Sequence, residues 1–325
     1  MGVIPEWLRL RDVNRRTYLG TVGAAVAGGV AGCSGAPGAA TDEGDGQSGD
    51  STDGTDASAA SVGEWSGGTL SFALPPFQDA EQLEEEYQPV FDWLAEGFDG
   101  VDAIDSTTTT SYSAVVESVT NGHSDVANLS PLIYAMAEEE GVHPVAINWS
   151  HGAESYHGYI ATRAETDIEE LADIEGKTVA MVDPLSTSGG MFPRYMLSQA
   201  GLDAGDMDTE PADFDIEWAF GHGESLTALE EGHVDAAAYG DFQHPDDEGI
   251  VKIAESDPIP FDPIVARPGT PESVREELTE RLVNTPEEAL ADHRVDRFGE
   301  VEPGTYDPVR EVAAEMGVEI GDLSE

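Results

Sequence analysis

A strand that runs into a helix through a hydroxyl-rich turn constrains the fold of this 325-residue chain more than any other feature. Residues 177–182 are mostly β-branched, small or apolar and are bounded by Gly176 and Pro184, which predicts a buried strand. From Met191 onwards, apolar residues recur at helical spacing until Gly201 ends the run. Because a strand followed by a helix is the building unit of α/β proteins, we expect a fold of that class.

The turn between this strand and helix carries Ser186, Thr187 and Ser188, followed by Gly189 and Gly190. The first N–H groups of a helix have no intrahelical partner, and the helix dipole is positive at this end. Three hydroxyl groups and two glycines would let an oxyanion approach these amides closely. The alternative interpretation is an ordinary N-cap, for which one Ser or Thr is enough. Three hydroxyls in a row exceed that need, so we predict an anion site.

The first 66 residues do not belong to the same pattern. Twin arginines precede a short apolar run over residues 20–32, which is too short to cross a bilayer and ends at Cys33, the only cysteine. This order is typical of an export signal with a lipobox, and the twin arginines resemble those of Tat substrates. We expect residues 1–33 to be that signal, with Cys33 lipidated, and residues 34–66 to be a disordered acidic tether rich in Gly, Ser, Asp and Thr.

The charge of the chain is strongly negative, with 66 acidic against 14 basic residues and a formal net charge of −52. This balance excludes a basic nucleic-acid-binding surface. Apolar segments continue throughout the chain, so we interpret the excess as the surface of a folded protein adapted to strong brine, of the haloarchaeal kind, and not as disorder. Self-repulsion of this size would destabilise the fold in dilute buffer.

The alternation of strands and helices predicts how the folded part is divided. It begins near residue 69 and restarts near residue 167. We therefore expect an α/β protein of two lobes, each a mostly parallel sheet flanked by helices. Residues 67–162 and 260–325 are assigned to the first lobe, and residues 163–259 to the second.

Several motifs resemble one family in the same order along the chain. The sequence Asp-Pro-Leu-Ser-Thr-Ser-Gly at residues 183–189, followed by Pro-Arg-Tyr-Met-Leu, resembles the signature of the PhnD-type phosphonate-, phosphite- and phosphate-binding proteins of ABC transporters. Other segments are similar to the family at Tyr112, Tyr156, Gly221–His222 and the sequence Pro-Ile-Pro-Phe-Asp-Pro at residues 258–263.

This resemblance implies a type II periplasmic-binding-protein fold that holds a phosphorus oxyanion in a cleft between two closing lobes. It also implies the ligand contacts, which would come from Ser186, Thr187, Ser188, Tyr112, Tyr156, His222 and Asp262. Asp262 would suit a protonated phosphoryl oxygen or a ligand amine. An acidic residue that pairs with the amine of aminoalkyl phosphonates in some members is Phe242 here, with Asp241 one place earlier. Phosphate, phosphite and simple phosphonates all stay open.

The function that the resemblance implies is that of an extracytoplasmic, monomeric lipoprotein, anchored to the membrane only by lipid, that delivers its ligand to an ABC permease and ATPase. It needs no catalysis, cofactor or metal. Two alternatives stay open: a sensor that presents the ligand-bound lobes to a membrane receptor, and a hydrolase that uses a serine of the turn with His222 as base. No Gly-x-Ser-x-Gly turn, phosphate-binding Gly-Lys-Ser/Thr loop or metal-binding helix motif supports an enzyme. Sequons at Asn128 and Asn148 are weak evidence for glycosylation.

Overall fold

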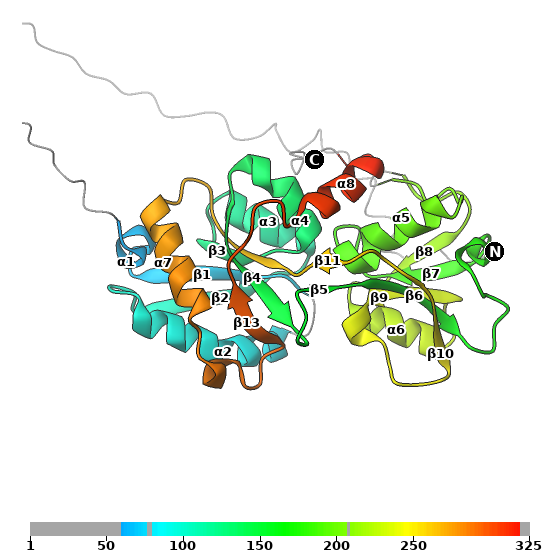
Figure 1. Ribbon diagram of the computed structural model, residues 1–325, viewed down its shortest axis with the longest axis horizontal. Helices are drawn as coiled ribbons and strands as arrows, with labels where there is room; N and C mark the ends of the chain where they lie inside the picture. Colours follow the sequence, from blue (N-terminus) through cyan, green and yellow to red (C-terminus); the bar gives the residue numbers. More distant parts are fainter. Residues whose placement is uncertain (1–59, 77–79, 207–208, 319–325) are drawn as a thin grey trace, which may run out of the picture. The chain divides into compact units, whose positions relative to one another are not determined.

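Two sheets, each covered by helices, organise the computed structural model, which describes residues 60–76, 80–206 and 209–318 (Figure 1). The predicted α/β class and the two sheet-containing lobes are confirmed. The expected signal segment, Cys33 and nearly all of the expected tether lie outside the described residues.

The first sheet has six strands in the order β13-β4-β12-β3-β1-β2. Their bounds are β1 Thr69–Leu74, β2 Ala103–Thr108, β3 Val126–Asn128, β4 His143–Ser150, β12 Pro263–Ala266 and β13 Val295–Gly299. β1 is parallel to β2 and β3, but β12 lies antiparallel between β3 and β4, and β13 is antiparallel to β4. The pairings are therefore mixed where we expected a mostly parallel sheet, because β12 returns from the second lobe in the reverse direction.

Helices cover both faces of the first sheet. Their bounds are α1 Val62–Ser66, α2 Ala80–Gly97, α3 Tyr112–Thr120, α4 Pro131–Ala137, α7 Glu272–Val283 and α8 Asp307–Glu315. On one face, Leu83 and Phe91 of α2, Leu278 of α7 and Phe72 of β1 belong to one buried cluster. On the other face, α3, α4 and α8 bury a second cluster. Each large apolar side chain buried in this way contributes about 1.5–3 kcal/mol.

The second sheet has five strands in the order β10-β6-β9-β7-β8. The bounds of its elements are β6 Gly158–Arg163, β7 Thr178–Met181, β8 Asp215–Trp218, β9 Ala236–Gly240, β10 Ile250–Glu255, α5 Phe192–Gln199 and α6 His222–Glu230. The central strand β9 is buried along its whole length, and Ala236 and Ala238 join one core cluster while Ala237 joins another. The small side chains of β9 let elements pack closely on both of its faces.

The chain crosses between the sheets at two short strands, β5 (Ser155–Tyr156) and β11 (Ile259–Pro260), which pair antiparallel with each other. The boundary that we expected after residue 162 is wrong, because β6 pairs with β9 and β10 in the second sheet. The first crossing therefore lies at β5. A similar correction applies to the expected tether, whose last residues form α1.

Helix α1 is anchored to the first lobe. The side chain of Ser61 caps it by accepting a hydrogen bond from the Glu64 amide at 3.2 Å, and the Val62 amide donates to Glu277 Oε2 at 2.9 Å. Val62 is fully buried in the same cluster as Phe72. The folded part thus begins before residue 67, because Val62 supplies the apolar surface that the rest of the expected tether lacks.

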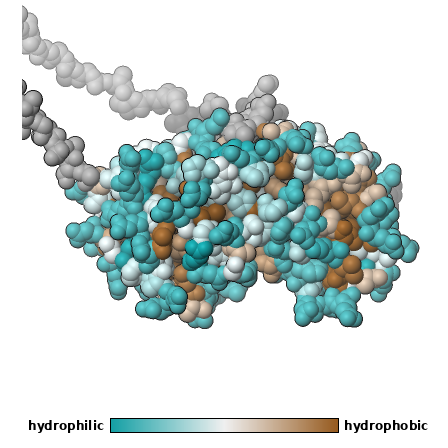
Figure 2. Space-filling model, in the orientation of Figure 1, coloured by the Kyte–Doolittle hydropathy of each residue, from teal (hydrophilic) through white to brown (hydrophobic). Residues whose placement is uncertain are grey.

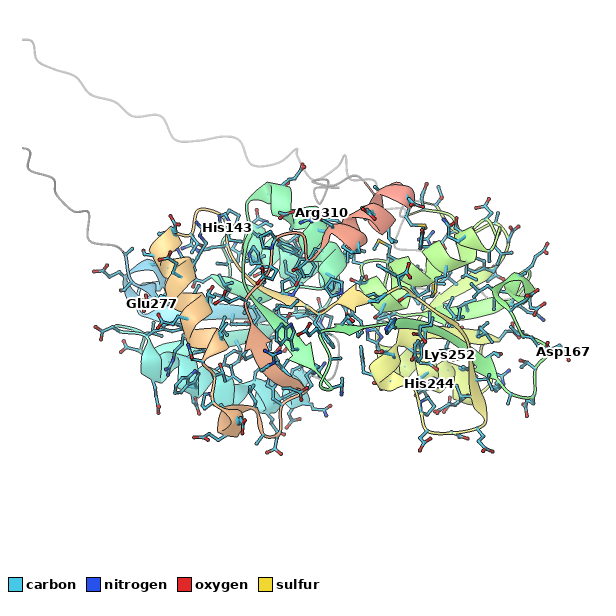
Figure 3. The ribbon with its side chains drawn as sticks, viewed as in Figure 1. His143, Asp167, His244, Lys252, Glu277 and Arg310 are labelled. Atoms are coloured by element: carbon cyan, nitrogen blue, oxygen red, sulfur yellow. The ribbon has the colours of Figure 1, made fainter. Side chains whose placement is uncertain are left out.

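The face of the molecule drawn in Figure 2 is mostly hydrophilic, with smaller hydrophobic areas between the hydrophilic residues. Lys252, one of two lysines in the chain, pairs with Glu255 and lies with its ammonium 4.3 Å from the ring centroid of Tyr159 on the second lobe (Figure 3). Asn128 and Asn148 are both buried, which is unsuited to glycosylation. Among the described helices, none is long and apolar enough to cross a membrane.

Candidate functional site

The hydroxyl-rich turn forms a tight π-helical turn, η5 (Thr187–Met191), that continues directly into α5. Ser186 caps it, because its Oγ accepts a hydrogen bond from the Gly189 amide at 3.2 Å. A Cβ atom at Gly190 would lie 2.0 Å from the carbonyl oxygen of Asp183, so the turn needs glycine there. All three hydroxyl residues are buried, which is costly for polar groups unless they have partners.

The start of helix α4 in the first lobe holds this turn. The Leu132 amide donates to Thr187 Oγ1 at 2.9 Å, and Ser130 Oγ donates to the carbonyl oxygen of Leu185 at 3.0 Å. Thr187 is thus a structural link between the lobes as well as a candidate ligand contact. Its hydroxyl acts as an acceptor in this bond, and none of the residues that the structure describes takes the proton of that hydroxyl.

Two buried tyrosines lie next to the serines of the turn. Tyr112 begins α3 and is 4 % exposed, and Tyr156 lies in β5 and is 7 % exposed. Burial raises the pKa of both hydroxyls, and the negative charge of Asp262 raises it further. The polar side chain of Ser186 opposes the shift in the pKa of Tyr112, and that of Ser188 opposes the shift for Tyr156. Both tyrosines are therefore neutral donors that face the turn.

Asp262 lies between β11 and β12, where the Asn148 amide donates to its backbone carbonyl oxygen at 3.0 Å. Burial raises the pKa of its carboxyl group to about 7, although the positive charge of Arg294 lowers it. None of the described residues donates a hydrogen bond to this carboxyl group. Near neutral pH the group therefore exists in both forms, and its protonated form can donate a hydrogen bond to an anion.

His222, the first residue of α6, has a defined tautomer. The Gly240 amide donates to its Nδ1 at 3.0 Å, so the neutral ring carries its proton on Nε2. Burial is the main cause that lowers the pKa of His222 to about 4, and the charge of Arg294 lowers it further. At neutral pH, His222 is therefore an uncharged hydrogen-bond donor through Nε2.

Two residues near these side chains have no counterpart in the predicted site. Arg294, just before β13, donates through Nε to Glu86 Oε1 at 2.9 Å, and its charge acts on Tyr112, His222 and Asp262. His151 has a positive φ of 55° and its ring stacks on that of Phe242. A lone arginine carries no motif, so the sequence offered no signal for it. The strain at His151 is of the kind that concentrates at functional sites.

Five of the predicted contacts interact with one another, since Ser186, Ser188 and Asp262 influence the pKa of Tyr112 or Tyr156. His222 joins them through the ring of Phe242, which lies 5.1 Å from that of His222 and 5.9 Å from that of Tyr156, between centroids. Thr187 follows Ser186 in the same turn. The site residues from the second lobe thus meet those from the first lobe and the crossing.

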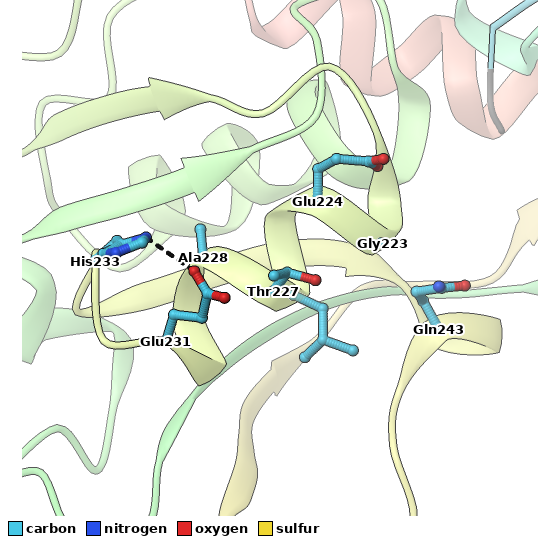
Figure 4. A pocket seen from close by; sticks show the side chains of 8 residues that line it. Gly223, Glu224, Thr227, Ala228, Glu231, His233 and Gln243 are labelled. Atoms are coloured by element: carbon cyan, nitrogen blue, oxygen red, sulfur yellow. Dashed lines mark ion pairs between the residues drawn. The ribbon is translucent and has the colours of Figure 1, made fainter. Parts of the chain in front are cut away.

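A separate groove on the second lobe does not share these residues. It lies beside α6, near Gly223, Thr227 and Gln243, and His233 Nδ1 is 3.5 Å from Glu231 Oε2 at its edge (Figure 4). None of the predicted ligand contacts lines it. Within the described ranges, no cluster of three or more His, Cys, Asp or Glu side chains could hold a metal ion.

Comparisons with known proteins identify the family of the chain. Residues 72–306 match the family described as "ABC transporter, phosphonate, periplasmic substrate-binding protein". The Phosphate-import protein PhnD of Mycolicibacterium smegmatis is 30 % identical over 175 residues, which are 52 % of this chain and 54 % of that protein. The chain thus matches about half the length of this curated relative.

Solved structures show the same fold at low identity. A binding protein component of an ABC phosphonate transporter from Pseudomonas aeruginosa has a TM-score of 0.64 at 17 % identity, covering 77 % of this chain and 86 % of its own. PhnD1 from Prochlorococcus marinus in complex with methylphosphonate has a TM-score of 0.63 at 16 % identity, covering 78 % and 99 %. The chain belongs to the family of periplasmic substrate-binding proteins of phosphonate ABC transporters.

Proposed function

We propose that this protein captures a phosphorus oxyanion between its lobes and delivers it to an ABC permease. The observation that carries the proposal is the convergence of neutral donors from both sides, with Tyr112 beside Ser186 and Tyr156 beside Ser188. Neutral hydroxyls, an uncharged imidazole N–H and a carboxyl group with a pKa of about 7 can all donate to oxyanion oxygens. Because these donors are uncharged, they can bind an anion even though the chain carries few basic residues.

The hydrolase alternative gains little support from the same side chains. A general base works best with a pKa near the working pH, but the pKa of His222 is lowered to about 4. Its Nδ1 accepts from the Gly240 amide, whereas the base of a serine triad donates from that position to an orienting carboxylate. The sensor alternative uses the same contacts and differs only in its membrane partner.

The location of the protein is part of the proposal. Cys33 would carry the lipid that holds it at the outer face of the membrane after export through the Tat pathway, and the acidic surface would keep it dispersed in the brine of a haloarchaeal habitat. Mass spectrometry of the membrane-extracted protein would show the acyl groups on Cys33. A mature protein with a free Cys33 thiol would refute the anchor.

Calorimetry of the purified protein in strong brine is expected to show one-to-one binding of a phosphorus oxyanion. The series is phosphate, phosphite, methylphosphonate and 2-aminoethylphosphonate, with methanesulfonate as a control for a tetrahedral anion without phosphorus. Each ligand should be recovered unchanged after incubation. Failure of all four phosphorus compounds to bind would refute the proposed ligand class, and release of a product would restore the hydrolase.

The pH dependence of binding should depend on Asp262. Since its folded-state pKa is about 7, the carboxyl group is mostly ionised above that pH and repels an anionic ligand. Relative to Asp262→Asn, wild-type affinity is expected to fall by up to about tenfold for each pH unit above 7. The ligand titrates identically in both measurements. The ratio of the wild-type affinity to the Asp262→Asn affinity therefore reports the effect of Asp262 alone. A wild-type affinity that rises with pH relative to that of Asp262→Asn would show that the ionised carboxylate accepts a hydrogen bond from the ligand.

A further inference from the structure

Phe242 is unusually exposed for a phenylalanine that lies within a cluster of rings. It is 42 % exposed, yet its ring lies 5.1 Å from that of His222 at an interplanar angle of 65° and 5.9 Å from that of Tyr156 at 47°. The ring of His151 stacks on it at 6.5 Å and 9°. Two of these three neighbours are oxyanion donors of the proposed site, so Phe242 lies beside the side chains that would hold the ligand.

The backbone fixes the place of this ring. Phe242 lies in the short helical turn η6 (Asp241–Gln243) directly after β9, and the Asp241 amide donates to the carbonyl oxygen of His157 at 2.8 Å. A Cβ atom at Gly240 would lie 2.2 Å from the Phe242 ring, so only glycine lets the ring fold back towards His222. Two features of the chain thus position the ring: the hydrogen bond that holds the start of η6 and the glycine at residue 240.

The residue before Phe242 in the sequence is Asp241. Asp241 is half-buried, and burial raises its pKa, while the His157 backbone amide contact and the charges of His157 and His151 lower it. A ligand ammonium placed against Phe242 would lose water, and its interaction with the ring would be weak compared with that of a carboxylate partner.

We propose that Phe242 is the specificity-determining contact for the substituent on phosphorus, and that the ligand is a phosphonate with an uncharged, apolar alkyl or aryl group. This inference rests on the proposed function. The donors of His222 and Tyr156 hold phosphoryl oxygens, and the fourth substituent of the tetrahedral phosphorus lies against the exposed ring. An apolar substituent removes the ring face and itself from water, which favours binding in proportion to the area covered.

The test compares the binding of phosphate, propylphosphonate, phenylphosphonate and 2-aminoethylphosphonate by calorimetry in the wild type, Phe242→Ala and Phe242→Glu. In the wild type, propylphosphonate should bind at least about tenfold more tightly than 2-aminoethylphosphonate. This ratio should fall in Phe242→Ala and fall further, by about tenfold or more, in Phe242→Glu. Val251→Ala is the matched control, because Val251 is also 42 % exposed but lies on β10.

Each outcome separates this inference from the proposed function. Binding of 2-aminoethylphosphonate at least as tightly as propylphosphonate in the wild type would overturn the inference alone. An unchanged ratio in Phe242→Glu would do the same, since binding of the other phosphorus compounds shows that the variant is folded. If no phosphorus compound binds the wild type, the proposed function itself fails and the inference falls with it.

Discussion

Replacement of Ser186, Thr187 and Ser188 together by alanine is expected to weaken oxyanion binding by about a thousandfold or more, to the limit of detection by calorimetry. Hydrogen bonds to a charged partner contribute about 1.5–3 kcal/mol each, so the loss of three is worth more than about 4 kcal/mol. The backbone amides at the start of η5 stay in place and would give the residual binding. This turn thus supplies most of the affinity in our proposal.

Folding needs a separate readout in this experiment, because two of the hydroxyls also have structural roles. Ser186 caps η5 and Thr187 accepts from the Leu132 amide, so the triple variant should lose roughly 2 kcal/mol of stability but still unfold cooperatively. A control without the hydroxyls of Thr120 and Thr227, which lie on α3 and α6, should bind normally. Near-normal affinity in the triple variant would refute the assigned anion site.

Ser188→Ala alone keeps the test decisive if the triple variant does not fold. The Ser188 side chain lies against the hydroxyl of Tyr156, and its removal leaves the cap of Ser186 and the bond of Thr187 intact. We expect a loss of about tenfold to a hundredfold in affinity with little change in the unfolding temperature. Unchanged affinity in this folded variant would count against the site as clearly as near-normal affinity in the triple variant.

A rise in the thermal unfolding midpoint by roughly 10 °C or more between 0.1 M and 2 M NaCl is the second large effect that we expect. The formal net charge is −52, and the repulsion among these carboxylates acts over about 10 Å at 0.1 M salt but only about 3 Å at 1 M salt. Since the compact state places these charges closer together than the unfolded chain does, screening favours folding. In dilute buffer, partial unfolding should be visible by circular dichroism.

Sucrose at matched osmolality provides the control for this salt effect. It stabilises folded proteins by exclusion from their surface but does not screen charge, so its effect on the midpoint should be clearly smaller. A second check is mild acidification, which protonates exposed carboxylates and should narrow the difference between low and high salt. A midpoint that is insensitive to NaCl would show that the acidic surface is not under appreciable repulsive strain.

The sequence predicts the local structure around the candidate site well, because that structure depends on short-range chemistry. Hydroxyls before Gly189 and Gly190, a helix start at Tyr112 and the prolines around Asp262 are all readable without contacts from elsewhere. Their meeting depends on pairings between distant segments, which a single sequence does not display. The resemblance to a known family supplied that information for the predicted contacts.

Other features depend on tertiary structure alone. Strand β6 has the same apolar pattern whichever sheet it joins, so its pairing with β9 and β10 was not readable and the expected boundary after residue 162 was wrong. Helix α1 has five residues in a segment rich in Gly and Ser, and only the burial of Val62 and its bond to Glu277 stabilise it. The influence of Arg294 on the site likewise requires the packing of β13 beside β4.

The position of Tyr156 within β5 has a mechanical consequence. Its partner across the two-stranded crossing is Ile259, so this proposed ligand contact is itself part of the ribbon that joins the lobes. In our proposal, a ligand that binds the Tyr156 hydroxyl also restrains this ribbon. Ligand binding and the angle between the lobes are then coupled. A membrane partner could then recognise the ligand-bound protein by the arrangement of its lobes, without contacting the ligand.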